Sequence, residues 1–198
     1  MKAIKAYAFL SGMLLISGVV VNAQETAPTP RAEVGLNYGF TRVNTGGTAG
    51  DFTQNGGSGY LEYNLNRYVG LVADLGGYHN GNINNFQIDN TVFTYLFGPR
   101  FNWRMSRVTP YIQMLVGGAR ISASYFDPAT SLRVAGHQNG FASALGGGLD
   151  IALTNHISLK PIQLEYLMTQ DPNPFTTALH TQNNLRYSAG VVLRLGAK

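Results

Sequence analysis

Large apolar residues alternate with small or charged residues along the segment LRYSAGVVLRLG, which spans residues 185–196 near the end of the chain. One phase of this alternation holds Leu185, Tyr187, Val191, Leu193 and Leu195, and the other holds Arg186, Ser188, Gly190 and Arg194. Successive side chains of a β-strand point to opposite faces, so the segment predicts a strand with one apolar face and one polar face.

The same two-residue period recurs in seven more segments upstream of this one. They are residues 32–43, 58–66, 68–78, 91–103, 109–122, 141–153 and 157–169. The residues that break the pattern are Leu96, Leu115 and Val192, which lie in the polar phase, and Ser158 and Lys160, which share the phase of Ile162. For the last pair, either this end of the strand is exposed to water on both faces or Pro161 marks a bulge. Together the segments predict an all-β chain of eight strands.

The connections between these segments alternate in length. The short ones are residues 66–67, 104–107 and 154–156, and the long ones, rich in Asn, Gly, Gln, Thr and Asp, are residues 44–57, 79–90, 126–139 and 170–182. This predicts an antiparallel up-and-down meander whose two ends face different surroundings. Such a meander is typical of an eight-stranded transmembrane β-barrel with short periplasmic turns and long extracellular loops.

The composition of the two faces indicates which one meets lipid. The polar phase is mostly Gly, Ala, Ser and Asn with a few charges, whereas the other phase is aromatic or aliphatic. An eight-stranded barrel is barely wide enough inside for side chains, so the small set fits the lumen and the bulky set faces the bilayer. The aromatic residues expected to form girdles at the membrane interfaces are Tyr38, Phe40, Tyr63, Tyr68, Phe93, Trp103, Tyr166 and Tyr187. The rival fold, a soluble β-sandwich, would leave an outer surface of Gly and Ala instead of charges.

The N-terminus is typical of a secretory signal peptide, with Lys2 and Lys5 before an apolar stretch that ends in small residues. We expect cleavage between Ala23 and Gln24, which removes residues 1–23 and leaves residues 24–31 as a short periplasmic segment before a barrel domain at residues 32–198.

Loss of the two lysines with the signal peptide brings basic and acidic residues close to balance. The sequence has no clustered basic patch, so we expect no nucleic-acid partner. The chain contains no Cys, so disulfides do not stabilise it.

The region from Ala32 to Gly196 resembles the OmpA/OmpX-like family of small outer-membrane β-barrels of Gram-negative bacteria. The resemblance is carried by Val34-Gly35-Leu36-Asn37-Tyr38, Pro110-Tyr111, the Gly-rich stretch from Leu145 to Asp150 and the closing strand from Tyr187 to Leu195. It implies an outer-membrane location among lipid and lipopolysaccharide, and we expect a monomer without cofactors. The chain departs from the family at Leu195-Gly196-Ala197-Lys198, where a terminal aromatic residue is usual. We expect no peptidoglycan-binding domain after the barrel.

Charged residues of the polar phase are expected to form a network in the lumen. They are Glu62, Asp74, Asp150 and Glu165 against Arg100, Arg186 and Arg194. Charges enclosed in a narrow barrel are costly unless they are paired. Glu165 and Arg186 share the inward phase on neighbouring strands, so we expect them to form a cross-strand pair. In the barrels that this chain resembles, such networks can interrupt a continuous water path.

Two groups of residues contain side chains that could act in catalysis or bind a metal ion. His156-Ile157-Ser158 resembles the His-x-Ser of outer-membrane lipid A deacylases, but Glu165 lies in the opposite phase and His156 lies in a short periplasmic turn. The histidines of three different long loops, His79, His137 and His180, contain no close-spaced ligand pair, so we expect no metal site.

The leading hypothesis is a non-enzymatic outer-membrane barrel without catalytic, cofactor or metal residues. It would contribute to envelope integrity or to surface interaction through its extracellular loops, where an unknown ligand or protein would bind. The alternatives are an outer-membrane lipid-modifying enzyme and a narrow pore or small-ligand barrel.

Overall fold

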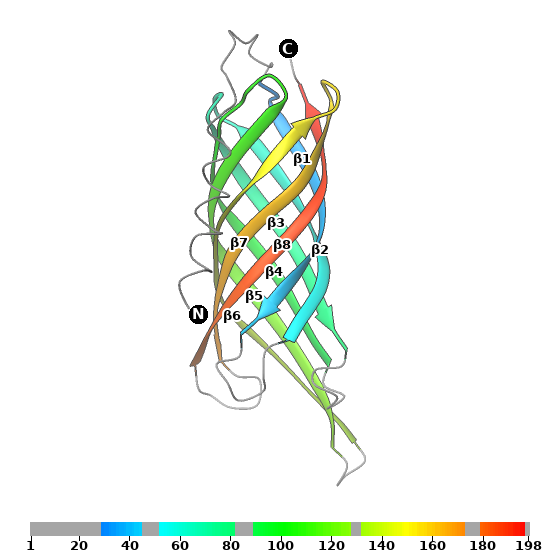
Figure 1. Cartoon of the computed structure of the whole chain (residues 1–198). Coiled ribbons are helices and arrows are strands. Elements are labelled where there is room, and N and C mark those ends of the chain that lie inside the picture. The colour runs from blue at the N-terminus through cyan, green and yellow to red at the C-terminus, as the bar shows by residue number, and fades with distance from the viewer. Residues whose placement is uncertain (1–28, 45–51, 82–88, 128–131, 173–178, 197–198) are drawn as a thin grey trace, which may run out of the picture.

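The computed structural model describes residues 29–44, 52–81, 89–127, 132–172 and 179–196. Within these ranges eight strands form one closed barrel, in which each strand pairs antiparallel with its sequence neighbours and the last closes on the first (Figure 1). The strands are β1 (Ala32–Val43), β2 (Phe52–Asn64), β3 (Val69–Asn80), β4 (Asp89–Asn102), β5 (Val108–Asp127), β6 (Leu132–Ala152), β7 (Ile157–Pro172) and β8 (Leu179–Leu195). The predicted all-β, up-and-down barrel is confirmed. The predicted signal peptide, with its cleavage site at Ala23 and Gln24, lies outside the described residues.

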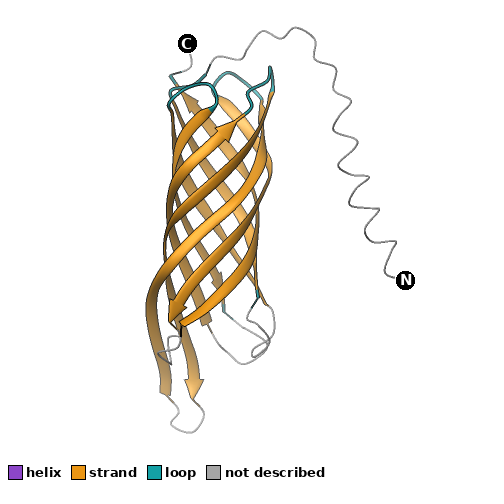
Figure 2. Ribbon diagram, turned by 90° about the vertical axis from the view of Figure 1, so that its left-hand side faces the viewer, coloured by secondary structure: helices purple, strands orange, loops and turns teal. Residues whose placement is uncertain are grey.

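The strands run further on the long-loop side than the alternation predicts. β1 has the predicted bounds, but β2 begins at Phe52, and the β5–β6 hairpin continues to Asp127 and resumes at Leu132. The predicted loops at 44–57, 79–90, 126–139 and 170–182 are therefore partly strand, so their bounds were wrong. Beyond the membrane both faces of a strand meet water, so the apolar alternation stops while the backbone ladder continues. The β5–β6 hairpin, yellow-green in Figure 1, projects farthest from the barrel (Figures 1 and 2).

The two phases of the alternation face the sides that the sequence predicts. Outward-facing Leu36 is 65 % exposed, whereas Glu62 in the opposite phase is fully buried. The predicted girdle residues all lie exposed on the outer surface: Tyr38, Phe40, Tyr63, Tyr68, Phe93, Trp103, Tyr166 and Tyr187. The exceptions Leu96, Leu115 and Val192 are buried in the lumen, where they join an apolar cluster with Tyr60, Val72 and Leu167. In the described ranges no helix is long and apolar enough to cross a membrane.

A β-bulge at Pro161 resolves the break in the alternation of β7. The register with β8 shifts between Lys160 and Gln163, and the register with β6 shifts at the same level. The extra residue turns Ser158 and Lys160 inward, and both side chains are fully buried. Proline is suited to this position because it has no N–H to donate to the ladder. Of the two explanations left open by the sequence, the bulge is confirmed.

Candidate functional site in the barrel lumen

The seven charged residues predicted for the lumen all face inward and are buried. Five of them meet in two groups of ion pairs. Arg100 Nη1 lies 2.8 Å from Glu62 Oε2, and Arg186 Nη2 lies 2.7 Å from Glu165 Oε2 and 3.6 Å from Asp74 Oδ1. The other two, Asp150 and Arg194, form no ion pair with these five residues in the described part of the chain.

Three further charged residues complete the set, although the alternation did not predict them as part of the network. Arg104 Nη2 lies 2.7 Å from Glu33 Oε1, and Lys160 Nζ lies 4.0 Å from Asp150 Oδ1. Among the described residues, the buried charged side chains are therefore five carboxylates and five cations. Two signals could have found them: Glu33 lies in the polar phase of its strand, and Arg104 follows outward-facing Trp103. Lys160 required the bulge to be placed first.

Amide side chains link the ion pairs into a network that crosses the barrel. Gln113 accepts a hydrogen bond from Arg100 Nε at 2.8 Å and donates one to Glu165 Oε1 at 2.7 Å. Gln163 accepts from Tyr111 Oη at 2.8 Å and from Lys160 Nζ at 3.1 Å. These contacts join β4, β5 and β7, and the Arg186–Asp74 contact joins β8 to β3 across the lumen. Side chains from opposite walls therefore meet at the level of this network.

Two tyrosines stack against both central cations. The Arg100 guanidinium carbon lies 4.6 Å from the centroid of Tyr60 and 4.2 Å from that of Tyr111. Lys160 Nζ lies 4.1 Å and 4.9 Å from the same two centroids. Each such contact contributes about 0.5–2 kcal/mol, most in a dry site. The rings place polarisable surface beside both positive charges, which reduces the cost of burying them.

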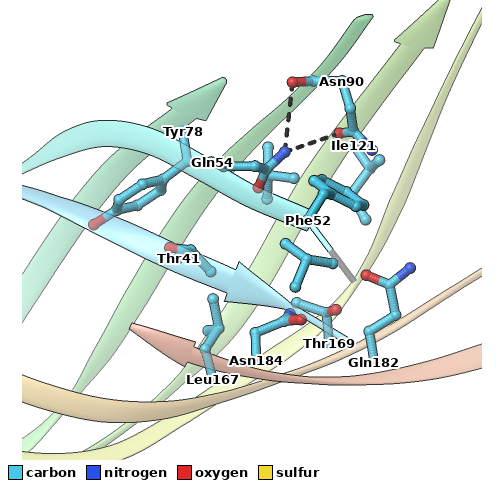
Figure 3. A pocket seen from close by; sticks show the side chains of 12 residues that line it. Thr41, Phe52, Gln54, Tyr78, Asn90, Ile121, Leu167, Thr169, Gln182 and Asn184 are labelled. Carbon is cyan, nitrogen blue, oxygen red and sulfur yellow. Dashed lines mark hydrogen bonds between the residues drawn. The ribbon is translucent and has the colours of Figure 1, made fainter. Parts of the chain in front are cut away.

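The extracellular mouth of the lumen contains a small pocket (Figure 3). Its lining combines hydroxyl and amide groups with apolar side chains: Thr41, Val43, Phe52, Gln54, Tyr78, Asn90, Val92, Ile121, Leu167, Thr169, Gln182 and Asn184. Gln54 Nε2 donates to the main-chain oxygen of Asn90 at 3.4 Å and to its Oδ1 at 3.3 Å. The enclosed volume is about 20 Å³, which suits about one water molecule. This pocket carries no charged residue among its lining.

A second hollow, of about 270 Å³, lies on the outer face of β4, β5 and β6 at the extracellular end. It is lined by Asp89, Thr91, Arg120, Ser122, Ala123, Ser124, Ala135, Gly136 and His137. Arg120 is the register partner of Phe93, a residue of the outer aromatic girdle. The hollow therefore begins at the level where the lipid-facing surface ends.

In the described part of the chain, the histidines do not form a metal site, and His156 and Ser158 do not form a catalytic pair. His79 and His137 lie in β3 and β6 instead of in loops, and His180 lies in β8 with its side chain outside the described part. Among the described residues, no group of three His, Cys, Asp or Glu side chains is placed to hold a metal ion. His156 is exposed in its turn, whereas Ser158 is buried in the lumen. The expectation that Glu165 faces away from Ser158 was wrong, because the bulge brings both residues to the inner side.

The closed backbone ladder, the apolar and aromatic outer surface and the ion-paired interior define an integral β-barrel of a membrane. The sequence model of the family described as outer membrane protein beta-barrel domain matches residues 11–196. The chain belongs to this family and is a protein of the outer membrane of Gram-negative bacteria.

Solved structures show the same fold. The attachment invasion locus protein Ail of Yersinia pestis has a TM-score of 0.61 at 16% identity, with 84% of this chain and 99% of that chain covered. Neisserial surface protein A has a TM-score of 0.63 at 13% identity, with 83% and 97% covered. OprG of Pseudomonas aeruginosa has a TM-score of 0.54 at 12% identity, with 87% and 100% covered. Another structure of Ail, with a TM-score of 0.56, is in complex with the heparin analogue sucrose octasulfate. The comparison with curated proteins found no match.

Proposed function

We propose that this protein is a non-enzymatic, monomeric barrel with a sealed lumen that contributes to the integrity of the outer membrane. The observation that carries this proposal is the charge-balanced network, in which Arg186 reaches Asp74 across the lumen and Gln113 connects Arg100 to Glu165. Side chains that meet from opposite walls of so narrow a barrel fill it and leave no wide aqueous path. A filled, ion-paired interior favours a structural role over transport.

Planar-bilayer recording of the refolded protein tests the sealed lumen. We expect no unitary conductance steps under conditions in which a porin control conducts. Regular steps would refute the sealed lumen and favour the narrow pore.

The lipid-modifying alternative requires a separate measurement. We expect the lipid A mass spectrum to be the same in cells with and without the protein, because exposed His156 and buried Ser158 do not share one accessible site. Loss of an acyl chain from lipid A that His156→Ala abolishes would favour the enzyme instead.

Integrity of the envelope is tested in cells that lack the protein. We expect faster uptake of a hydrophobic fluorescent probe, and restoration by the wild-type chain. A variant with a shortened β5–β6 hairpin, in which residues 124–135 are replaced by a two-residue turn, should restore the barrier equally well. Unchanged probe uptake in the deletion strain would contradict the structural role.

A second candidate function is binding of a surface ligand at the extracellular hollow. The support is the position of Arg120 and His137 among the hydroxyls of Thr91, Ser122 and Ser124. Ail, a structural neighbour, was crystallised with a sulfated sugar, and arginine and hydroxyl groups are suited to such an anion. Calorimetric titration of the folded protein with sucrose octasulfate tests it. Arg120→Gln should weaken binding about tenfold or more, whereas Arg107→Gln at the opposite end should not; equal affinities for wild type and Arg120→Gln would refute this site.

A further inference from the structure

The exposed charges on the periplasmic turns are all positive. Arg31 precedes β1, Arg67 lies between β2 and β3, and Arg107 lies between β4 and β5. Arg31 and Arg107 are exposed and Arg67 is half-buried, whereas the neighbouring Arg104 is buried and paired with Glu33. Within the described residues, these turns and the turn between β7 and β6 contain no Asp or Glu. The described part of the periplasmic end therefore exposes positive charge and no carboxylate side chain.

The arginines lie beside aromatic residues of the girdle at the periplasmic interface. Arg31 lies beside Tyr63, and this neighbour raises the pKa of its guanidinium. The Arg67 guanidinium carbon lies 5.6 Å from the ring centroid of Tyr68, and its Nη2 donates to the main-chain oxygen of Arg104 at 2.9 Å. This last bond joins the β2–β3 turn to the β4–β5 turn, which carries Trp103 and Arg107. Aromatic residues of this kind mark the depth of the lipid head groups.

We propose that this periplasmic rim, formed by Arg31, Arg67 and Arg107 beside Tyr63, Tyr68 and Trp103, is a binding site for the phosphate head groups of anionic phospholipids in the inner leaflet. Guanidinium groups bind phosphate oxygens through paired N–H donors. Arg67 still has free donors after its single bond to Arg104, and its position is fixed by two contacts, which lowers the entropy lost on binding. The aromatic neighbours place the arginines at head-group depth, which favours a lipid phosphate over the carboxylates of peptidoglycan farther into the periplasm.

The chain contains one tryptophan, and it lies at this site. Trp103 faces outward and is 47 % exposed, so its fluorescence reports on the lipids next to the periplasmic rim alone. The experiment reconstitutes the protein in phosphatidylcholine vesicles that contain phosphatidylglycerol and brominates the acyl chains of one lipid or the other. We expect brominated phosphatidylglycerol to quench Trp103 well beyond its share of the lipid, with a relative binding constant about fivefold above that of phosphatidylcholine for each arginine that contacts the phosphate.

Matched variants assign the preference to the rim. Arg107→Gln, whose side chain is exposed, should lower the preference about fivefold, and adding Arg67→Gln should reduce it to the share that Arg31 contributes. Arg42→Gln, at an exposed arginine near the extracellular end of β1, should leave it unchanged, and high salt should weaken it in the wild type. A folded-band gel shift for each variant separates loss of lipid preference from failure to fold.

Equal quenching by the two brominated lipids in the wild type, or an unchanged preference in the Arg67→Gln/Arg107→Gln protein, would overturn the proposal. Rim-dependent co-sedimentation with peptidoglycan sacculi without any lipid preference would also overturn it. Because conductance and lipid A composition do not enter this measurement, its outcome is independent of the proposed function.

Discussion

Arg186 bridges two carboxylates, so its removal should cost more stability than the removal of either one. Its Nη2 lies 2.7 Å from Glu165 and 3.6 Å from Asp74, and all three side chains are almost fully buried. Breaking a buried ion pair at one partner costs about 3–5 kcal/mol, because the other charge stays desolvated and unpaired. Arg186→Met leaves two such carboxylates, so we expect a loss of about 5 kcal/mol. Glu165→Gln leaves Arg186 with Asp74 and keeps an acceptor for Gln113, so we expect a loss of about 3 kcal/mol.

The double variant Arg186→Met/Glu165→Gln leaves only Asp74 without its partner. Its loss should therefore fall below the sum of the single losses by about 2–3 kcal/mol, and adding Asp74→Asn should recover most of the remainder. The assay is urea unfolding in lipid vesicles, followed by the fluorescence of Trp103 and by the gel mobility of the unheated protein. Strictly additive losses, or an Arg186→Met protein as stable as the wild type, would refute the bridging role of Arg186.

Three other predictions concern the lipid face, the packing of the lumen and export. Leu71→Arg should destabilise the barrel by about 2–4 kcal/mol, whereas Asn183→Arg, outward-facing but beyond the girdle, should cost about 1 kcal/mol or less in the same urea assay; equal losses would contradict the lipid-facing assignment. Gly146→Ala should cost about 1–3 kcal/mol because its Cβ would overlap the Leu164 carbonyl and the Glu165 side chain, whereas Gly77→Ala, which has no atom within 4 Å of the added carbon, should be neutral; similar losses at both positions would count against this packing. The mature protein should begin at Gln24, sediment with the outer membrane and run faster on gels before heating, and N-terminal sequencing that begins at Met1 would contradict cleavage.

The sequence predicted the inside and outside of the barrel because lipid imposes a two-residue period wherever it touches the strands. Leu71 and Leu145 lie outward and Asp74 and Glu165 inward as that period requires. The extracellular ends of the strands, which extend beyond the membrane, could not be predicted in the same way. At His137, for example, both faces of the hairpin meet water, so hydrogen bonding maintains the strand without leaving an apolar pattern in the sequence.

The charged site was predictable residue by residue but not as an arrangement. Phase alone places Glu62 and Arg100 in the lumen, yet their contact also depends on the stagger of strands that are not neighbours. The stacking of Arg100 and Lys160 on Tyr60 and Tyr111 depends in addition on the extra residue in β7. The sequence pattern shows that this extra residue disturbs the period, but it does not show which side the disturbed residues take.

The extra residue at Pro161 also affects how this strand can change during evolution. In a strand that separates lipid from a charged interior, one inserted or deleted residue exchanges the two faces of everything between it and the strand end. β7 already contains such an insertion, so deletion of Pro161 would turn Ser158 and Lys160 toward lipid although neither amino acid had changed. An alignment of β7 with a regular strand therefore needs a one-residue gap at this position, because without it a lumen lysine is matched to a lipid-facing residue.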